Sequence, residues 1–242
     1  MGRPRTLVGV DEKPIGRRVA LGVIGAGLTG IVFGARVQDV MERVLGPITV
    51  RDGTGLSSFL PVGRFRIYSV VGRLPRRDEA DYRLRIDGAV RNALTLTMRD
   101  LRAFPPLRVK KDFQCVTGWR VHDVKWTGVR LADVLDRAGV NENAGGVVFR
   151  SFDGAYTESL TVAQARRDDV MVAYELEGKP LSSMHGGPAR LYVAPMYGYK
   201  SLKWLESIEV VTGKPAPGYW EQRGYDTDAW IGRSNGRDDP AV

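Results

Sequence analysis

The fold class is decided by the stretch VVFRSFDGAYTESL, residues 147–160. Two runs of apolar, aromatic and β-branched residues flank an Asp-Gly pair in it, and such runs favour strands. Asp153-Gly154 tolerates the positive φ angles that a two-residue hairpin turn demands. The stretch therefore predicts antiparallel strands over 147–152 and 155–160, joined by a tight turn.

Outward from this hairpin, the chain continues as short strands separated by turns. Further strands are predicted over 64–71, 82–90, 170–176, 190–194 and 204–211. A short helix over 97–104 is expected to stop at Pro105-Pro106, and an apolar stripe at helical spacing runs from Leu131 to Ala138 before Gly139. There are no repeats and no alternation of parallel strands with helices. The pattern predicts a mixed, mainly antiparallel, strand-rich α+β fold.

The composition is that of a globular protein with a basic surface. The chain has 242 residues, of which 43% are hydrophobic, and a formal net charge of +8. The charge favours an anionic partner, which could be a nucleic acid, a membrane surface or a phosphate-bearing cofactor. Because the basic residues are scattered and no ribonucleoprotein or zinc-finger motif is present, we expect no nucleic-acid partner.

The amino terminus carries a twin arginine, Arg17-Arg18, before the uncharged run Val19–Ala35. This order is typical of an export signal of the twin-arginine type or of a membrane anchor. We therefore expect residues 1–50 to hold a hydrophobic helix and a linker. The catalytic part would then lie in the cell membrane or be exported to the outer face of the cytoplasmic membrane.

The same run has a second interpretation. Gly25-Ala26-Gly27-Leu28-Thr29-Gly30 fits the glycine fingerprint of flavin- and nicotinamide-binding proteins. That fingerprint works within alternating strands and helices, whereas a Gly- and Ser-rich stretch and antiparallel-type strands follow here. A dinucleotide-binding protein remains an alternative.

The only cysteine, Cys115, lies in a run of aromatic and basic residues. A lone cysteine is most often a small buried apolar residue, but a thiolate beside cations is a nucleophile or a metal ligand. His122 could form a hydrolase dyad with it, although no glycine-rich nucleophile elbow surrounds Cys115.

Four motifs follow one another in a fixed order: Phe113-Gln114-Cys115, Trp126-Thr127-Gly128-Val129, His185-Gly186-Gly187-Pro188-Ala189-Arg190-Leu191 and the run 195–204, PMYGYKSLKW. In this order the chain resembles the molybdopterin-binding domain of the sulfite oxidase family. It looks most similar to the bacterial branch that contains the catalytic subunit of the periplasmic methionine sulfoxide reductase. The resemblance covers about residues 64–211, and it implies a molybdopterin-binding oxidoreductase domain over 60–212.

The resemblance implies a molybdenum-molybdopterin cofactor whose metal is bound by the Cys115 thiolate. A soft sulfur ligand suits a metal that already has sulfur ligands from the pterin. Lys110, Lys111 and Arg120 are expected to help ionise the thiol. The residues implied in cofactor binding are Tyr68, Ser151, His185, Arg190, Ser201 and Lys203.

Among these, Arg190 and the segment from Ser201 to Lys203 are implied to hold the terminal phosphate. His185 stands where related enzymes commonly carry Asn, and either residue can donate a hydrogen bond. The alternative for Arg190, Lys200 and Lys203 is a solvated basic face, since flexible cations are usually exposed.

The expected activity is a two-electron redox reaction, by oxygen-atom transfer on a small sulfur-oxo or related substrate. Arg120 is the one arginine that we can assign to the substrate. Electrons would leave through a separate partner, for which a membrane haem protein is a candidate. A non-enzymatic cofactor-binding domain is the other alternative. The tail, residues 213–242, is expected to wrap the domain with Tyr219, Trp220 and Trp230 as anchors.

Overall fold

The computed structural model describes residues 65–117 and 119–232. The twin arginine, the glycine fingerprint and the helix expected within residues 1–50 lie outside the described residues. None of the helices in the described ranges has the length and apolar character needed to cross a membrane. The strand predicted over 64–71 is wrong, because residues 65–71 contain only an isolated bridge at Tyr68.

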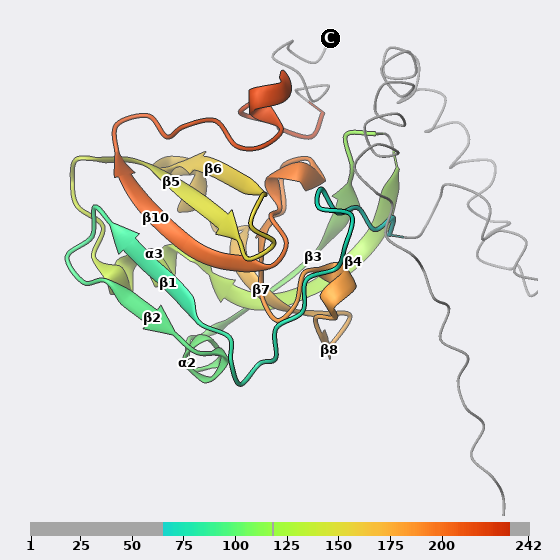
Figure 1. The fold of residues 1–242 in the computed structure, drawn as a ribbon, viewed down its shortest axis with the longest axis horizontal. Coiled ribbons are helices and arrows are strands. Elements are labelled where there is room, and N and C mark those ends of the chain that lie inside the picture. Colours follow the sequence, from blue (N-terminus) through green and yellow to red (C-terminus); the bar gives the residue numbers. More distant parts are fainter. Residues whose placement is uncertain (1–64, 118, 233–242) are drawn as a thin grey trace, which may run out of the picture.

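Two sheets form the described part of the chain (Figure 1). The first sheet contains β1 (Leu84–Gly88), β2 (Leu94–Leu96), β5 (Ala144–Ser151), β6 (Thr157–Thr161) and β10 (Leu205–Thr212). Its strand order is β2-β1-β10-β5-β6. The second sheet contains β3 (Pro106–Gln114), β4 (Arg120–Arg130), β7 (Val170–Leu176), β8 (Lys179–Pro180) and β9 (Arg190–Val193). Its order is β3-β4-β7-β8, and β9 also pairs with β7.

The strand pairing agrees with a mixed, mainly antiparallel α+β fold. β1 and β10 are parallel, with Ile86 opposite Ile208, and every other strand pair in the described residues is antiparallel. β1 and β10 are far apart in the sequence, so the register of this pair could not be read from local pattern. Along β1 the buried and exposed side chains alternate as predicted, with Leu84 and Ile86 buried.

The hairpin predicted over residues 147–160 is present, but its turn is not the predicted one. β5 and β6 pair antiparallel, with Arg150 opposite Thr157, so residues 152–156 form the connection. Gly154 has φ 82°, whereas Asp153 has no positive φ. Asp153 Oδ1 instead accepts hydrogen bonds from the backbone N–H groups of Ala155 and Tyr156, both at 2.8 Å. These hydrogen bonds from the Asp153 side chain stabilise the longer loop over residues 152–156.

The helices follow the sequence signals closely. In α2 (Met98–Arg102), Thr97 and Asp100 form a reciprocal capping box. α3 (Leu131–Ala138) ends at Gly139, whose φ of 70° is the left-handed conformation that glycine adopts at low cost. α4 (Val162–Ala165) is a single turn capped by Thr161. The predicted stripe of α3 is core, since Leu131, Val134, Leu135 and Ala138 are all fully buried.

The tail wraps the domain over its described part, residues 213–232. After β10 it runs along the upper edge of the view, above β5 and β6, to a short helix (Figure 1). Tyr219 is buried, and Trp230 forms an isolated bridge with Met196 and lies under the guanidinium of Arg167 at 5.1 Å. Residues 219 and 230 of the tail therefore pack against the rest of the described chain.

Candidate functional site

A pocket of about 150 Å³ collects side chains from segments that are far apart in the sequence. One wall is the segment 65–70, and another is the loop after β3 with Cys115, Val116, Thr117 and Trp119. His185, Arg190 and the 198–204 region form its base, and the tail adds Tyr219, Trp220 and Tyr225. The loop after β3 and the first residue of β9, Arg190, therefore line the same pocket, and the tail forms another of its walls.

Cys115 lies directly after β3, in the loop that connects β3 to β4. Its backbone N–H donates to the carbonyl of Trp119 at 2.9 Å, which closes the loop. The Thr117 hydroxyl donates to the Cys115 sulfur at 3.2 Å. Burial raises the pKa of the Cys115 thiol, while the hydrogen bonds of Thr117 and the charge of Arg66 act in the opposite direction. The thiol is therefore protonated in this pocket, and a metal that bound it would displace that proton.

The cations near Cys115 in sequence are not its neighbours in space. Lys110 pairs with Asp123 at 3.0 Å and Lys111 with Asp169 at 3.2 Å, so the expectation that they ionise the thiol is wrong. Side chains alternate between the two faces of a strand, and carboxylates outside the pocket bind both lysines. The cation that acts on Cys115 is Arg66, which the sequence analysis did not select.

Arg120 and His122 both lie on β4, outside the pocket lining. The Arg120 guanidinium donates to Gln114 Oε1 at 2.9 Å. His122 Nδ1 lies 2.9 Å from Asp112 Oδ2 on the exposed side of the hairpin. The hydrolase hypothesis needs a contact between His122 and Cys115, whereas the hydrogen bond described at the Cys115 sulfur comes from Thr117.

Arg190 is the first residue of β9, and it is only 4% exposed. Its guanidinium donates to three backbone carbonyls, those of His185 at 2.9 Å, Ser201 at 2.6 Å and Leu191 at 3.3 Å. It also lies 5.3 Å from the centre of the Trp126 ring. Burial lowers the pKa of Arg190 to about 10, so it remains a cation near neutral pH.

Lys203 is the second cation of the pocket. Its ammonium donates to the carbonyl of Tyr68 and lies 4.3 Å from the centre of the Trp204 ring. Burial, and then the charge of Arg190, lower the pKa of Lys203 to about 7. Among the described residues neither cation forms an ion pair with a carboxylate. A buried and a half-buried cation without a counter-ion among the described residues favour an anionic ligand.

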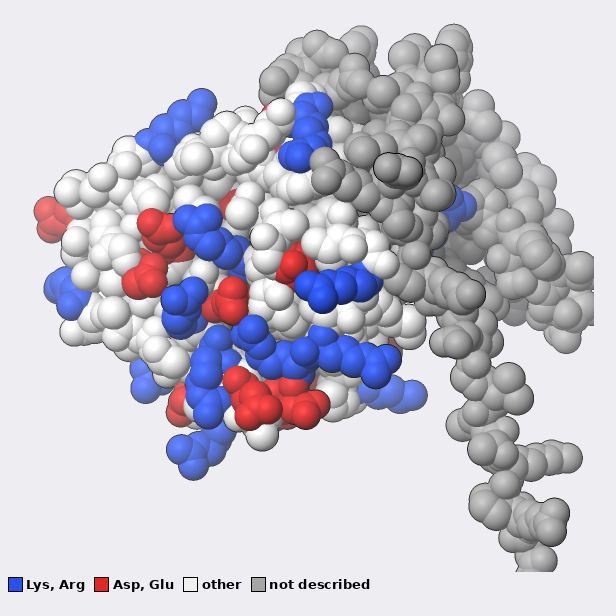
Figure 2. All heavy atoms as spheres, in the orientation of Figure 1, with Lys and Arg blue, Asp and Glu red and all other residues white. Residues whose placement is uncertain are grey.

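Arginines on the surface, unlike the two cations of the pocket, pair with carboxylates. Figure 2 shows basic and acidic side chains interleaved on one face of the molecule. Several exposed arginines pair with glutamates there or elsewhere on the surface, such as Arg102 with Glu79 at 2.7 Å and Arg150 with Glu209 at 2.7 Å. The solvated-face alternative is thus wrong for Arg190 and Lys200, which are buried, and for Lys203, which bonds to Tyr68 inside the pocket.

The other predicted cofactor residues divide into two groups. Tyr68, His185 and Ser201 line the pocket, whereas Ser151 does not. Burial, with Arg190 and Lys203 adding to it, lowers the pKa of His185 to about 4, so the ring is neutral near pH 7. The Ser201 hydroxyl accepts from the backbone N–H of Val193 at 3.0 Å, and that of Ser151 accepts from the N–H of Asp153 at 3.1 Å.

Several pocket residues carry sequence signals of another kind. Asp153 belongs to a turn signal, and Tyr219 and Trp220 to the aromatic spacing of the tail. Asp153 Oδ2 is buried without a hydrogen-bond partner among the described residues and lies on the pocket wall. The Asp-Gly signal and the aromatic spacing marked these positions, but their shared cavity depends on contacts between distant segments.

The donor set fits a metal that brings most of its own ligands. In the described ranges no group of three or more His, Cys, Asp or Glu side chains could hold a metal ion by itself. One thiol and two unpaired cations in the same cavity suit a group with a metal at one end and a phosphate at the other. Arg binds phosphate through a planar fork and Lys through a point charge.

Comparison with known proteins agrees with this chemistry. Residues 71–220 match the model of the family described as "oxidoreductase molybdopterin binding domain". An uncharacterised oxidoreductase of Bacillus subtilis, YuiH, is 37% identical over 148 residues, which are 61% of this chain and 74% of that protein. Sulfite oxidase of Arabidopsis thaliana is 32% identical over 178 residues, 60% of this chain and 45% of that protein.

Two further similarities are with proteins from other bacteria. A putative protein-methionine-sulfoxide reductase subunit of Azospira oryzae, YedZ1, is 31% identical over 157 residues, 65% of this chain and 58% of that protein. The crystal structure of the sulfane dehydrogenase SoxCD from Paracoccus pantotrophus has a TM-score of 0.56 and 23% identity, and covers 64% of this chain and 43% of that one. At that identity the structural match shows the fold. The chain spans less than two thirds of both proteins.

Proposed function

Since the chain belongs to the oxidoreductase molybdopterin-binding domain family, we propose that it transfers an oxygen atom to or from a small sulfur-oxo substrate. It is a molybdenum-dependent oxidoreductase with a molybdenum-molybdopterin cofactor. When bound, this cofactor supplies a metal centre that exchanges two electrons and an oxygen atom. The protein holds the cofactor and limits access to the pocket.

The observation that carries the proposal is the arrangement of one thiol and two unpaired cations around one cavity. Cys115 would ligate the metal as a thiolate, and Thr117, which donates to its sulfur, would stabilise that anion and orient it. Binding expels the thiol proton, whose loss burial otherwise opposes.

Arg190 and Lys203 would hold the terminal phosphate. The guanidinium is fixed by three backbone carbonyls, so it loses little side-chain entropy when the anion binds. A phosphate beside Lys203 would raise its pKa from about 7 and keep it charged. Neutral His185, with Tyr68 and Ser201, would bond to the polar edge of the pterin.

The substrate would enter beside the aromatic side chains of the tail. Tyr219, Trp220 and Tyr225 form an apolar wall, and Arg66 is the exposed cation of the pocket lining. The names of the relatives, sulfite oxidase and a methionine-sulfoxide reductase subunit, support a sulfur-oxo substrate. A separate electron-transfer partner, for which a membrane haem protein is a candidate, would exchange electrons with the cofactor bound in the pocket.

Export is part of the proposal. A cofactor enclosed by a folded domain must be inserted before export if it is made in the cytoplasm, and the twin-arginine route carries folded proteins. In intact cells an external protease should digest the wild-type domain, and Arg17→Lys/Arg18→Lys should protect it. A wild-type domain that is protected, with no effect of the double substitution, would rule out export.

Cys115→Ser tests the metal ligand. We expect it to fold and to retain much of the pterin, because Arg190 and Lys203 are unchanged, and to lose turnover, because a hydroxyl ionises less readily than a thiol. X-ray absorption should show one sulfur fewer in the molybdenum shell. The matched control is Thr117→Val, which removes the hydrogen bond to the sulfur and should keep that shell. An identical molybdenum-sulfur shell in wild type and Cys115→Ser would disprove the assignment.

A further inference from the structure

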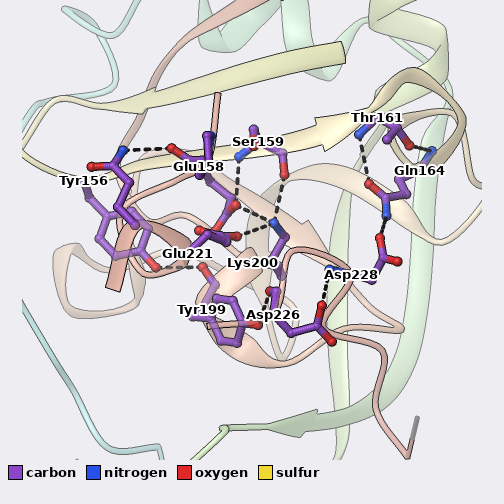
Figure 3. Close-up of polar contacts among 12 residues, drawn as sticks. Tyr156, Glu158, Ser159, Thr161, Gln164, Tyr199, Lys200, Glu221, Asp226 and Asp228 are labelled. Carbon is purple, nitrogen blue, oxygen red and sulfur yellow. Dashed lines mark hydrogen bonds and ion pairs between the residues drawn. The ribbon is translucent and has the colours of Figure 1, made fainter. Parts of the chain in front are cut away.

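Beside the pocket lies a third cation, Lys200, whose environment differs from that of Arg190 and Lys203. It is fully buried in η3 (Gly198–Lys200). Its ammonium lies 2.6 Å from Glu158 Oε1, 2.5 Å from Glu221 Oε1 and 2.9 Å from the carbonyl of Ser159 (Figure 3). All three of its N–H groups therefore have acceptors.

The charges of this cluster do not balance if both carboxyl groups are ionised. Glu158 is fully buried and Glu221 nearly so, yet within the described part of the chain Lys200 is the one cation that pairs with them. The second oxygen of each carboxyl, Oε2, is buried without a partner among the described residues. An uncompensated negative charge with unpartnered oxygens costs several kcal/mol in a protein interior.

The two carboxyl groups converge on one ammonium and on one point of the chain. A Cβ atom built on Gly218 would lie 2.6 Å from Glu221 Oε2 and 2.9 Å from Glu158 Oε1, so both groups crowd one point of the chain. Burial raises the pKa of Glu158 well above its usual range, and Glu221 adds to this through its charge and a hydrogen bond, although Lys200 opposes it. Two carboxyl groups that share a site commonly hold one proton between them.

The cluster joins three segments of the chain. Glu158 belongs to β6, Lys200 to η3, and Glu221 begins η4 (Glu221–Arg223) in the tail. On the tail side, Tyr219 stacks on Tyr156 at 5.4 Å, and both rings line the pocket. On the other side, the carbonyl of Ser201, the residue after Lys200, accepts a hydrogen bond from Arg190.

We propose that Glu158 and Glu221 share one proton above Lys200, and that this neutral cluster fastens the tail in place as a wall of the pocket. Loss of the proton leaves a buried net negative charge, which is relieved when Glu221 moves into water with the tail. Undocking of the tail then removes Tyr219, Trp220 and Tyr225 from the pocket. The cluster acts on the site through the tail, so its members are positioning residues.

The other titratable groups near the cluster are already bonded elsewhere. The Tyr156 hydroxyl donates to the carbonyl of Tyr199 at 2.7 Å, and the Tyr199 hydroxyl donates to the carbonyl of Asp226 at 2.6 Å. Asp226 Oδ1 accepts from the N–H of Asp228, and Asp228 Oδ1 accepts from Gln164 (Figure 3). Each of these contacts holds a segment in place, and none supplies a counter-charge to the carboxyl pair.

Infrared absorption of the full-length holoprotein tests the shared proton. Near pH 8, where an exposed glutamate is ionised, the wild type should show the C=O stretch of a buried carboxylic acid. Glu158→Gln and Glu221→Gln should each lose that band, because the amide takes the place of the protonated carboxyl. The matched control is Glu209→Gln, which removes an exposed partner of Arg150 and should keep the band. Identical spectra in all four proteins would overturn the proposal.

Hydrogen exchange of the tail tests whether the cluster keeps the tail docked on the pocket. The backbone N–H of Tyr219 donates to the carbonyl of Thr157, and that of Ile231 to the carbonyl of Pro195, so both report on docking of the tail. Relative to the amides of α3, their protection in the wild type should fall by up to about tenfold per pH unit above the pKa of the pair. Both Gln variants should lack this pH dependence, and Glu221→Ala should lower protection at every pH. Equal pH dependence in wild type and both Gln variants would overturn the proposal.

Discussion

At the scale of the residue, the same side-chain chemistry serves opposite purposes a few positions apart. Lys200 pairs with two glutamates, whereas the described contacts of Arg190 and Lys203 are with carbonyls and aromatic rings. A cation that is desolvated but left without a counter-ion is costly, and it is retained where a ligand supplies the missing charge. Lys200 stabilises the protein before any ligand arrives, and the other two become stable once an anion is bound.

Replacement of Arg190 tests its assignment. Arg190→Ala should lose cofactor while the thiol ligand is kept, because a charge-assisted contact is worth about 1.5 to 3 kcal/mol, roughly ten- to a hundredfold in affinity. Molybdenum and pterin content of the purified protein is the measurement. Arg150→Ala, which removes an exposed arginine paired with Glu209, should keep full content. Unchanged content in Arg190→Ala would mean that the residue does not hold the cofactor.

The thiol and the two cations of the pocket could be predicted at this scale, because motifs preserve residue type and order. Cys115, Arg190 and Lys203 were all selected from sequence, and all three line the cavity. Arg120 and Ser151 were also selected but lie outside its lining. A sequence motif does not predict on which face of a strand a side chain lies when an irregular loop precedes that strand. The partners of Lys200 come from β6 and the tail, and no local pattern indicates that they meet.

At the scale of the element, local signals worked where the interaction itself is local. α3 has the predicted stripe and its glycine cap, and α2 begins at a capping box. The turn of the β5–β6 hairpin was mispredicted because Asp153 bonds to its own loop and points into the pocket. The predicted strand over 64–71 is instead a pocket wall, whose Tyr68 carbonyl accepts from Lys203.

The capping box of α2 gives a stability prediction. Thr97→Ala removes the acceptor of the Asp100 N–H and the partner of its carboxyl group. Loss of such a cap costs about 0.5 to 2 kcal/mol in the free energy of unfolding. Chemical denaturation should show this loss with an unchanged denaturant slope, and Thr95→Ala on the exposed side of β2 is the control. Equal stability of the two variants would mean that the box contributes nothing to the fold.

At the scale of the whole molecule, the pocket exists only when the tail, the β3–β4 loop and the segment 65–70 come together. The match to the family extends from residue 71 to residue 220, so it includes the first part of the tail. β10 ends at Thr212, close to the boundary expected after residue 212. Buried side chains continue beyond it into the tail, for example Tyr219 and Tyr225. Such long-range closure depends on tertiary packing, and sequence periodicity does not report it.

The unpaired cations should make the stability of the cofactor-free protein depend on pH. The pKa of Lys203 is lowered to about 7 in the folded state, below its usual value of 10.5. The unfolded chain therefore binds more protons at this side chain between the two values. This side chain therefore lowers the free energy of unfolding progressively as the pH falls from 10.5 to about 7, and by no more below that pH. The carboxyl pair of Glu158 and Glu221 acts in the opposite direction, so the contribution of Lys203 must be isolated with a variant.

Sulfate, which stays a dianion near neutral pH, can supply the missing charge. It should raise the melting temperature of cofactor-free wild type more near pH 6 than near pH 8, because Lys203 is charged at the lower pH. Lys203→Met keeps a long apolar side chain and should show only the general stabilisation that sulfate gives any protein, equal at both pH values. A pH-dependent sulfate effect of the same size in wild type and Lys203→Met would mean that another group, and not Lys203, responds to the anion.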